Sequence, residues 1–275
     1  MSFGEQVVSA TSLAPALCVG LDPHPEVLQA WRCSDDGPGI AEWVGLIVEG
    51  LAQVKPRFVK PQAAFFERLG LPGMTALARL LGECRGLGIC VIGDAKRGDI
   101  GSTMLGYAEA WLSPGADFEV DALTLVPYQG LGALMPALEL SLSHGKGIFV
   151  LAATSNAEAW QLQSAQRSDG VSVAGGVIEE LSRFREDNPG SLTSHGVVIG
   201  ATVDHAQLGV DLTNQPAMPI LAPGYGAQGA KLNESRDHFP HSHHLLAASA
   251  RGIIGGGPEG FPSRYELAMT QLQSA

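Results

Sequence analysis

Apolar residues along the chain fall into short continuous runs that alternate with helical stripes. The runs occur at positions 16–21, 58–60, 89–93, 121–126, 147–152, 196–201, 219–222 and 245–248. Between several of these runs, apolar residues recur at the three- and four-residue spacing of an amphipathic helix. Such stripes occupy positions 43–54, 74–84, 104–112 and 173–184. The pattern predicts eight strands that alternate with helices.

The apolar runs also indicate how the strands are arranged. Continuous rather than alternating hydrophobicity is typical of strands buried on both faces, as in a parallel sheet covered by helices. No linker-like stretch and no internal repeat interrupts the alternation. We therefore predict an α/β fold in which residues 1–275 form a single (β/α)8 barrel, a TIM barrel with its active site at the C-terminal ends of the strands. A doubly wound open sheet is the alternative architecture.

Composition narrows the range of partners. The 275 residues include 28 acidic and 17 basic side chains, which gives a formal net charge of −11, and only 16% of residues are charged. A chain so poor in Lys and Arg lacks the basic face that nucleic acids require, so no nucleic-acid partner is expected. No apolar stretch approaches the roughly 18 residues of a membrane span, and the N-terminus lacks the pattern of a signal peptide. No membrane association is expected either.

The cysteines bear on the cellular compartment. Cys18, Cys84 and Cys90 lie in apolar segments, Cys33 does not, and no C-x-x-C pair is present. We expect buried, reduced thiols and a cytoplasmic protein, with a disulfide pair as the alternative.

Charged residues gather at the ends of the first three predicted strands. Asp22 follows the first strand, Lys60 ends the second, and Asp94 and Lys96 follow the third, with Asp99 just beyond. On a regular strand, Asp94 and Lys96 would point to one face, about 6–7 Å apart. Lys60 and Asp99 would extend them into an array in which each charge keeps its neighbours ionised. The alternative is a structural salt-bridge network without a function.

A glycine-rich segment, APGYGAQG at 222–229, follows the seventh predicted strand. Its G-x-G-x-x-G pattern also occurs in dinucleotide sites, but no acidic residue ends the following strand to hold a ribose. After strand seven of a barrel, such a loop instead predicts a phosphate cradle of backbone N–H groups, and Arg251 can add bidentate charge. A glycine-rich turn without a ligand is the alternative. A second G-x-G-x-x-G, at 255–260, contains Pro258 and is expected to be a bare loop.

Histidines cluster before the last strand, at His238, His241, His243 and His244. Their spacing is not that of a structural zinc site, so a solvated loop is favoured over a metal site. We expect this segment at the opposite end of the barrel from the charged residues.

These positions together carry a family resemblance. Residues 94–103, DAKRGDIGST, contain the pattern D-x-K-x-x-D-I-x-x-T. Further matching segments are LCVGLDP at 17–23, FVKPQ at 58–62, VVIGAT at 197–202, PGYGAQG at 223–229 and ARGI at 250–253. In this order they resemble the orotidine 5′-monophosphate decarboxylase family, from about Leu17 to Ile254. The DAKRGDIGST run looks like the bacterial subgroup with slightly longer chains, whereas D-x-K-x-x-D alone is shared with related phosphosugar enzymes.

The resemblance implies decarboxylation of orotidine 5′-monophosphate to uridine 5′-monophosphate, in de novo pyrimidine synthesis, without a cofactor or metal. Lys96 would protonate C6 of the pyrimidine and Asp94 would face the leaving carboxylate. Lys60 would bridge the ribose and the acidic residues, and Asp22 would bind a ribose hydroxyl. Asp99 completes the set of catalytic candidates.

The resemblance also implies the remaining substrate contacts. Ser155 would contact the pyrimidine, with Thr154 and Asn156 as alternatives at that position. Gln228 and Arg251 would hold the phosphate. A further implied feature is a homodimer, because Asp99 would reach the neighbouring subunit's site together with Ile100 and Thr103.

The chemistry itself favours fixed charge over a cofactor. Loss of CO2 from C6 leaves an electron pair in an orbital orthogonal to the ring's π system, and no cofactor motif offers an electron sink. An ammonium aimed at C6 can stabilise that pair and then protonate it. One alternative is a Mg²⁺-dependent sugar-phosphate decarboxylase or aldolase of the same superfamily, which usually carries an acidic residue where Lys60 stands. The other is a non-catalytic nucleotide-phosphate binder.

Overall fold

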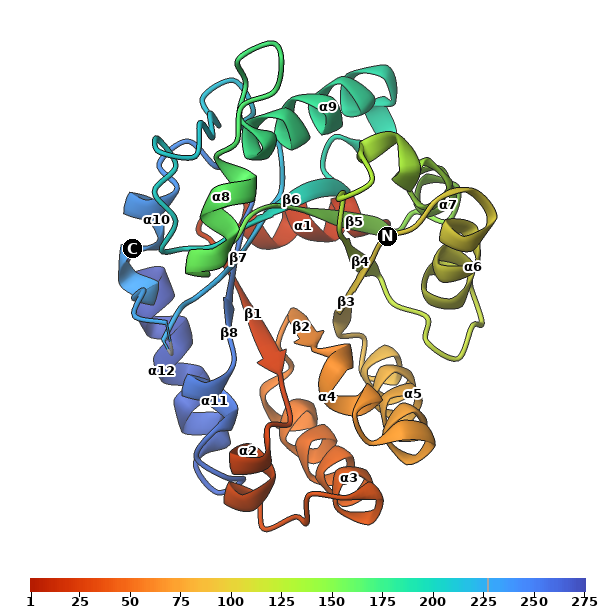
Figure 1. The fold of residues 1–275 in the computed structure, drawn as a ribbon. Coiled ribbons are helices and arrows are strands. Elements are labelled where there is room, and N and C mark those ends of the chain that lie inside the picture. The colour runs from red at the N-terminus through yellow and green to blue at the C-terminus, as the bar shows by residue number, and fades with distance from the viewer. Residues whose placement is uncertain (227) are drawn as a thin grey trace.

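Eight parallel strands close into a barrel in their order along the chain (Figure 1). The computed structural model describes residues 1–226 and 228–275. The strands are β1 (Ala16–Leu21), β2 (Phe58–Pro61), β3 (Cys90–Arg97), β4 (Ala122–Leu125), β5 (Gly147–Ala153), β6 (His195–Ile199), β7 (Ile220–Pro223) and β8 (Leu245–Ser249). Because β1 pairs with β8 as well as with β2, the sheet has no edges. The predicted (β/α)8 barrel is confirmed, and the open sheet is excluded.

Helices surround these strands (Figure 1). They are α1 (Phe3–Thr11), α2 (Pro25–Ala30), α3 (Gly37–Val54), α4 (Ala63–Glu67), α5 (Gly70–Gly86), α6 (Gly101–Leu112), α7 (Met135–Ser143), α8 (Trp160–Gln163), α9 (Val173–Asp187), α10 (Ser235–His238), α11 (Arg251–Ile254) and α12 (Phe261–Gln273). The four apolar stripes correspond to α3, α5, α6 and α9. The sequence pattern did not predict the other eight described helices, of which α1, α7 and α12 are the longest. None of the described helices is both long enough and apolar enough to cross a membrane.

Strand residues alternate between the barrel interior and the layer beneath the helices. Cys18, Phe58, Ile92 and Ala122 belong to the interior cluster, which Phe3 of α1 joins. The Phe3 ring packs edge-on against Phe58, with ring centroids 6.3 Å apart. Burial of an aromatic or aliphatic side chain of this size contributes about 1.5–3 kcal/mol. Helix α1 therefore helps to fill the barrel with apolar side chains toward its N-terminal end.

The same alternation places polar side chains inside the C-terminal mouth. Because side chains two residues apart share a face, the position after Phe58 on the interior face is Lys60, and the position after Ile92 is Asp94. On β4, Thr124 follows the interior residue Ala122 by the same rule. The barrel interior therefore has an apolar layer, with a layer of charged and polar side chains above it at the C-terminal mouth.

Strand β3 differs most from its prediction. It was expected over 89–93 but runs to Arg97, and its pairing with β4 shifts register between Gly93 and Arg97. Within this irregular stretch, Lys96 has a φ of 48°, in the left-handed region that few non-glycine residues adopt. The other strands begin and end within two residues of the predicted positions.

The four cysteines are free and buried, as expected, so the disulfide alternative is excluded.

Candidate active site

Three charged side chains meet at the C-terminal mouth of the barrel. Lys60 Nζ lies 2.7 Å from Asp94 Oδ2, and Lys96 Nζ lies 2.5 Å from Asp94 Oδ1. Asp22 flanks the array, with its Oδ1 3.9 Å from Lys60 Nζ. The carboxylate of Asp94 is thus held between two ammonium groups. Lys60 lies on β2, and Asp94 and Lys96 lie on the neighbouring β3.

Burial and charge act in opposite directions on this array. Lys60 and Asp94 are 6% and 7% exposed. Burial alone would raise the pKa of Asp94, but Lys60 and Lys96 outweigh it and hold the pKa at about 2. Burial would likewise lower the pKa of Lys60, but Asp94 and Asp22 hold it above its usual value. Both groups are therefore ionised at neutral pH.

Lys96 differs from Lys60 in being accessible, since 41% of its side chain is exposed. Its Nζ also donates to Gln62 Oε1 at 3.2 Å. The array therefore contains a buried ammonium, an ionised carboxylate and an ammonium that faces the open mouth. Such an arrangement can present a proton donor to a molecule bound above it.

Thr124 of β4 connects the backbone and side chains of the array. Its hydroxyl donates to Asp94 Oδ1 at 3.0 Å and accepts from the Lys96 backbone N–H at 3.0 Å. One buried hydroxyl thus fixes both the carboxylate and the left-handed turn that aims Lys96. The sequence analysis missed Thr124 and Gln62. Period-two alternation alone places Thr124 inside the barrel, but its partners depend on the pairing of β3 with β4.

A cavity of about 300 Å³ adjoins the array. Its polar lining comes from Asp22, His24, Lys60, Gln228, Ser249 and Arg251. Asp22 Oδ1 is buried without a hydrogen-bond partner among the described residues, so a ligand hydroxyl would satisfy it. His24, which the sequence analysis also missed, packs its ring against Phe65 at a centroid distance of 4.0 Å. The cavity extends from the charged array to an exposed guanidinium on α11.

The glycine-rich loop forms one wall of this cavity. Gly224, Gly226 and Gly229 have φ values of 119°, 86° and 97°, which favour glycine at each position. The Gly226 backbone N–H donates to the Ala230 carbonyl, and the Gly229 N–H donates to Gly226. Ala227, part of the predicted phosphate cradle, lies outside the described residues.

The structure joins two predicted substrate residues from distant segments. The Ser155 hydroxyl donates to Gln228 Oε1 at 2.9 Å, across the gap between the segment after β5 and the glycine-rich loop. Thr154 and Asn156, the alternatives to Ser155, hydrogen-bond to each other instead. Ser155 is therefore the member of this trio that reaches the cavity wall.

The predicted dimer residues lie apart from the array within one chain. Asp99 accepts from the Ile100 backbone N–H at 2.8 Å and forms no ion pair among the described residues. The spacing predicted an array of Lys60, Asp94, Lys96 and Asp99. Within the single chain, the structure brings the first three together and leaves Asp99 apart. Ile100 is 60% exposed, and Thr103 is exposed on the first turn of α6.

Fold and site together define a class of protein, the (β/α)8-barrel enzymes with a charged array and a glycine-rich loop at the C-terminal mouth. Comparison with known proteins narrows this class. The chain belongs to the orotidine 5′-phosphate decarboxylase / HUMPS family, whose model matches residues 15–257.

Individual relatives agree with this assignment. An orotidine 5′-phosphate decarboxylase of Corynebacterium efficiens is 41% identical over 269 residues, covering 94% of this chain and 91% of the relative. That of Salinispora tropica is 42% identical over 261 residues, with the same coverage. Among solved structures, a candidate orotidine 5′-phosphate decarboxylase of Streptomyces avermitilis superposes with a TM-score of 0.91 at 38% identity, covering 100% of this chain and 95% of that one.

Proposed function

We propose that this protein is a cytoplasmic enzyme of de novo pyrimidine synthesis that decarboxylates orotidine 5′-monophosphate to uridine 5′-monophosphate without a cofactor. The observation that carries the proposal is the Lys60–Asp94–Lys96 array beside a cavity that ends at Arg251. Residues 1–275 act as one domain, and the DAKRGDIGST run assigns the chain to a bacterial subgroup of the family.

The array accounts for the chemical step. The bond between C6 and the carboxylate carbon breaks, CO2 leaves, and the electron pair stays on C6. Lys96 stabilises that pair through its ammonium charge and donates a proton to C6. Asp94 faces the substrate carboxylate, and their repulsion falls as the negative charge departs. Because Lys60 holds Asp94 ionised, this repulsion is available at neutral pH.

The cavity accounts for substrate binding. Arg251, Gln228 and the backbone of the glycine-rich loop hold the phosphate, and Asp22 and Lys60 hold ribose hydroxyls. Ser155 contacts the pyrimidine from beside Gln228. These contacts lie away from the bond that breaks, so their binding energy aligns the substrate over Lys96.

The active unit is a homodimer. Asp99, Ile100 and Thr103 lie on or near an exposed face at the start of α6, and Asp99 has no charged partner among the described residues of its own chain. We assign these residues to the neighbouring subunit's site, where Asp99 joins the array.

A spectroscopic assay tests the proposed reaction. Purified protein is mixed with orotidine 5′-monophosphate, and the ultraviolet spectrum of the pyrimidine is followed with and without excess chelator. We expect conversion at an undiminished rate in chelator. Loss of activity in chelator would favour the Mg²⁺-dependent sugar-phosphate alternative, although Lys60 places a buried cation where that class carries an acid. Binding of the nucleotide without conversion would identify a non-catalytic binder.

Two variants assign the residues. Lys96→Ala is expected to abolish turnover while a nucleotide monophosphate still binds, because the proton donor is lost and the phosphate contacts remain. Arg251→Ala is expected to lower kcat/KM mainly through substrate capture. Near-normal turnover of Lys96→Ala would remove Lys96 from its role, and an unchanged kcat/KM would do the same for Arg251.

A further inference from the structure

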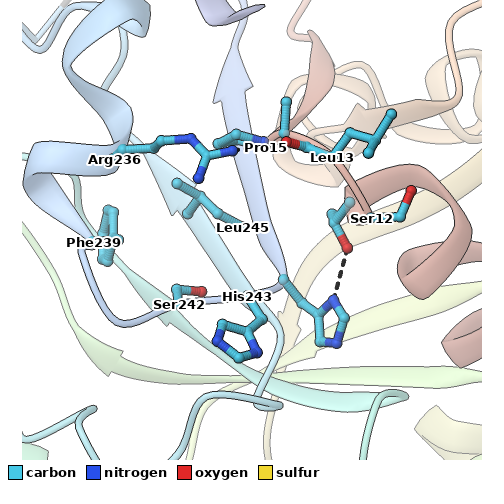
Figure 2. Close-up of a pocket in the computed structure, with 11 residues that line it drawn as sticks. Ser12, Leu13, Pro15, Arg236, Phe239, Ser242, His243 and Leu245 are labelled. Atoms are coloured by element: carbon cyan, nitrogen blue, oxygen red, sulfur yellow. Dashed lines mark hydrogen bonds between the residues drawn. The ribbon is translucent and has the colours of Figure 1, made fainter.

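A second cavity lies at the opposite end of the barrel from the charged array. Figure 2 shows the residues that line it. It has a volume of about 320 Å³, similar to the substrate cavity, and falls at the small end of the range of about 300–1,000 Å³ typical of ligand sites. Its walls are the segment between α1 and β1 and the segment between α10 and β8, namely residues 11–15, 236, 239 and 242–245. These segments precede strands, so the cavity opens at the N-terminal end.

The polar side chains of this cavity are one guanidinium, two imidazoles and several hydroxyls. Arg236, His243 and His244 line it together with hydroxyl side chains, and the described lining includes no acidic residue. That composition is unusual in a chain with 28 acids and 17 basic residues. Arg236 donates to the Leu13 carbonyl at 2.9 Å, which holds its guanidinium at the cavity wall, and it forms no ion pair among the described residues. An Arg in this state can still bind an anion.

The hydroxyls reinforce this character. The Ser242 Oγ is buried without a hydrogen-bond partner among the described residues, and Thr11 Oγ1 hydrogen-bonds to His244 Nδ1 at 2.7 Å. Burial lowers the pKa of His244, and the nearby His243 and Arg185 lower it further. Arg185 thus places a positive charge near His244. Of the four histidines expected in a solvated loop, His241 and His243 are exposed. The expectation is wrong for the other two, because His238 ends α10 and His244 is half-buried.

We propose that this cavity binds a small phosphate-bearing anion, either inorganic phosphate or a phosphate monoester. The guanidinium of Arg236 supplies charge, and the imidazole of His243 and the unpartnered hydroxyl of Ser242 supply further hydrogen-bonding groups for a tetrahedral group with several acceptor oxygens. Apolar side chains of Leu13, Pro15 and Leu245 form the remaining wall, which suits the carbon skeleton of a monoester. The site is separate from the substrate cavity because the length of β8 lies between them.

Counting bound phosphate tests the site. Equilibrium dialysis of the full-length protein with radiolabelled inorganic phosphate is expected to find two sites per chain. Arg236→Gln should remove one site or weaken it roughly tenfold or more, because a charge-assisted hydrogen bond is lost. Arg251→Gln should remove the other. Displacement of label from the Arg236 site by glycerol 3-phosphate would identify a monoester site, and its retention would identify a site for free phosphate.

Controls separate this result from general charge and folding effects. Arg183→Gln removes an exposed charge on α9 and should leave both sites intact. His243→Gln is a second test variant at an exposed position, should Arg236→Gln fail to fold. A single phosphate site in the wild type that disappears in Arg251→Gln, or an undiminished count in both Arg236→Gln and His243→Gln, would overturn the proposal. Neither outcome depends on whether the protein decarboxylates its substrate.

Discussion

Lys60 and Asp94 bring opposite full charges into the barrel interior, directly above an apolar layer. Taking a charge out of water costs several kcal/mol, and a pair is tolerated only when the geometry and additional hydrogen bonds compensate. Asp94 meets this condition by accepting from Lys60, Lys96 and Thr124. Its ionised form is therefore maintained by the fold itself.

Because its pKa is low, the ionised Asp94 stabilises the fold at neutral pH and loses this effect in acid. Its folded-state value of about 2 lies below the ordinary 3.8, so the stabilisation is present above about pH 4 and is lost as the pH falls through 2. The shift corresponds to about 2 kcal/mol. We expect the stability gap between wild type and Asp94→Asn to narrow by about this amount from pH 4 to pH 2, measured by urea unfolding. A gap that stays constant with pH would contradict this assignment.

Thr124 holds the reacting groups through its hydrogen bonds to Asp94 and to the Lys96 backbone, and it does not line the proposed substrate cavity. Thr124→Val keeps the volume but removes the acceptor for the Lys96 N–H and the donor to Asp94, so we expect kcat to fall roughly tenfold with a smaller change in KM. The free energy of unfolding should fall by about 1–3 kcal/mol. Thr124→Ser retains the hydroxyl and should recover most of kcat. Equal losses of kcat in both variants would indicate a packing role only.

At the scale of elements, the glycine-rich loop after β7 depends on backbone conformation. A Cβ at Gly226 would meet nothing closer than Ser249 Oγ at 3.7 Å, so the cost of Gly226→Ala comes from its φ of 86°. That cost is about 1–2 kcal/mol. We expect Gly226→Ala to raise KM several-fold with kcat less affected, as measured by steady-state kinetics.

A glycine in a helix provides the matched control. Gly82 lies within α5, and a Cβ there would meet no atom within 4 Å. Gly82→Ala should leave KM unchanged and raise the free energy of unfolding by about 0.5–1 kcal/mol, because alanine favours the helix. An unchanged KM in Gly226→Ala would show that substrate binding does not depend on the conformation of this loop.

The helices and strands also show how much of the structure can be predicted from the sequence. Continuous apolar runs located the strands, and period-two alternation explains why Lys60 and Asp94 face inward. The same reasoning took β3 as regular, and so missed the left-handed Lys96 and the register shift that brings its Nζ to Asp94. The buried faces of α1, α7 and α12 include small or polar residues such as Thr11, Ser141 and Ala268, which weaken the apolar periodicity of their sequences. Thr124 and Gln62 were missed because cross-strand contacts depend on register.

At the scale of the whole molecule, the proposed dimer makes each site a shared one, and mixing two inactive variants tests this. Lys96→Ala and Asp99→Ala are each expected to be inactive. If each site takes Lys96 from one chain and Asp99 from the other, half of the randomly mixed dimers contain one intact site, so about a quarter of wild-type activity should return. Subunit exchange is verified by mass spectrometry of differently tagged chains. No recovery after verified exchange would place Asp99 in its own chain's site.

Buried cysteines in two layers of the barrel can report how the molecule opens. Cys18 and Cys90 lie in the interior cluster, whereas Cys84 of α5 packs in the layer beneath the helices. Burial raises the pKa of Cys18 and of Cys84 to about 12, so neither thiol reacts appreciably while it stays covered. The rate of alkylation without denaturant therefore measures opening of the structure. The rate at Cys84 reports opening of the layer beneath the helices, and the rate at Cys18 and Cys90 reports separation of the strands.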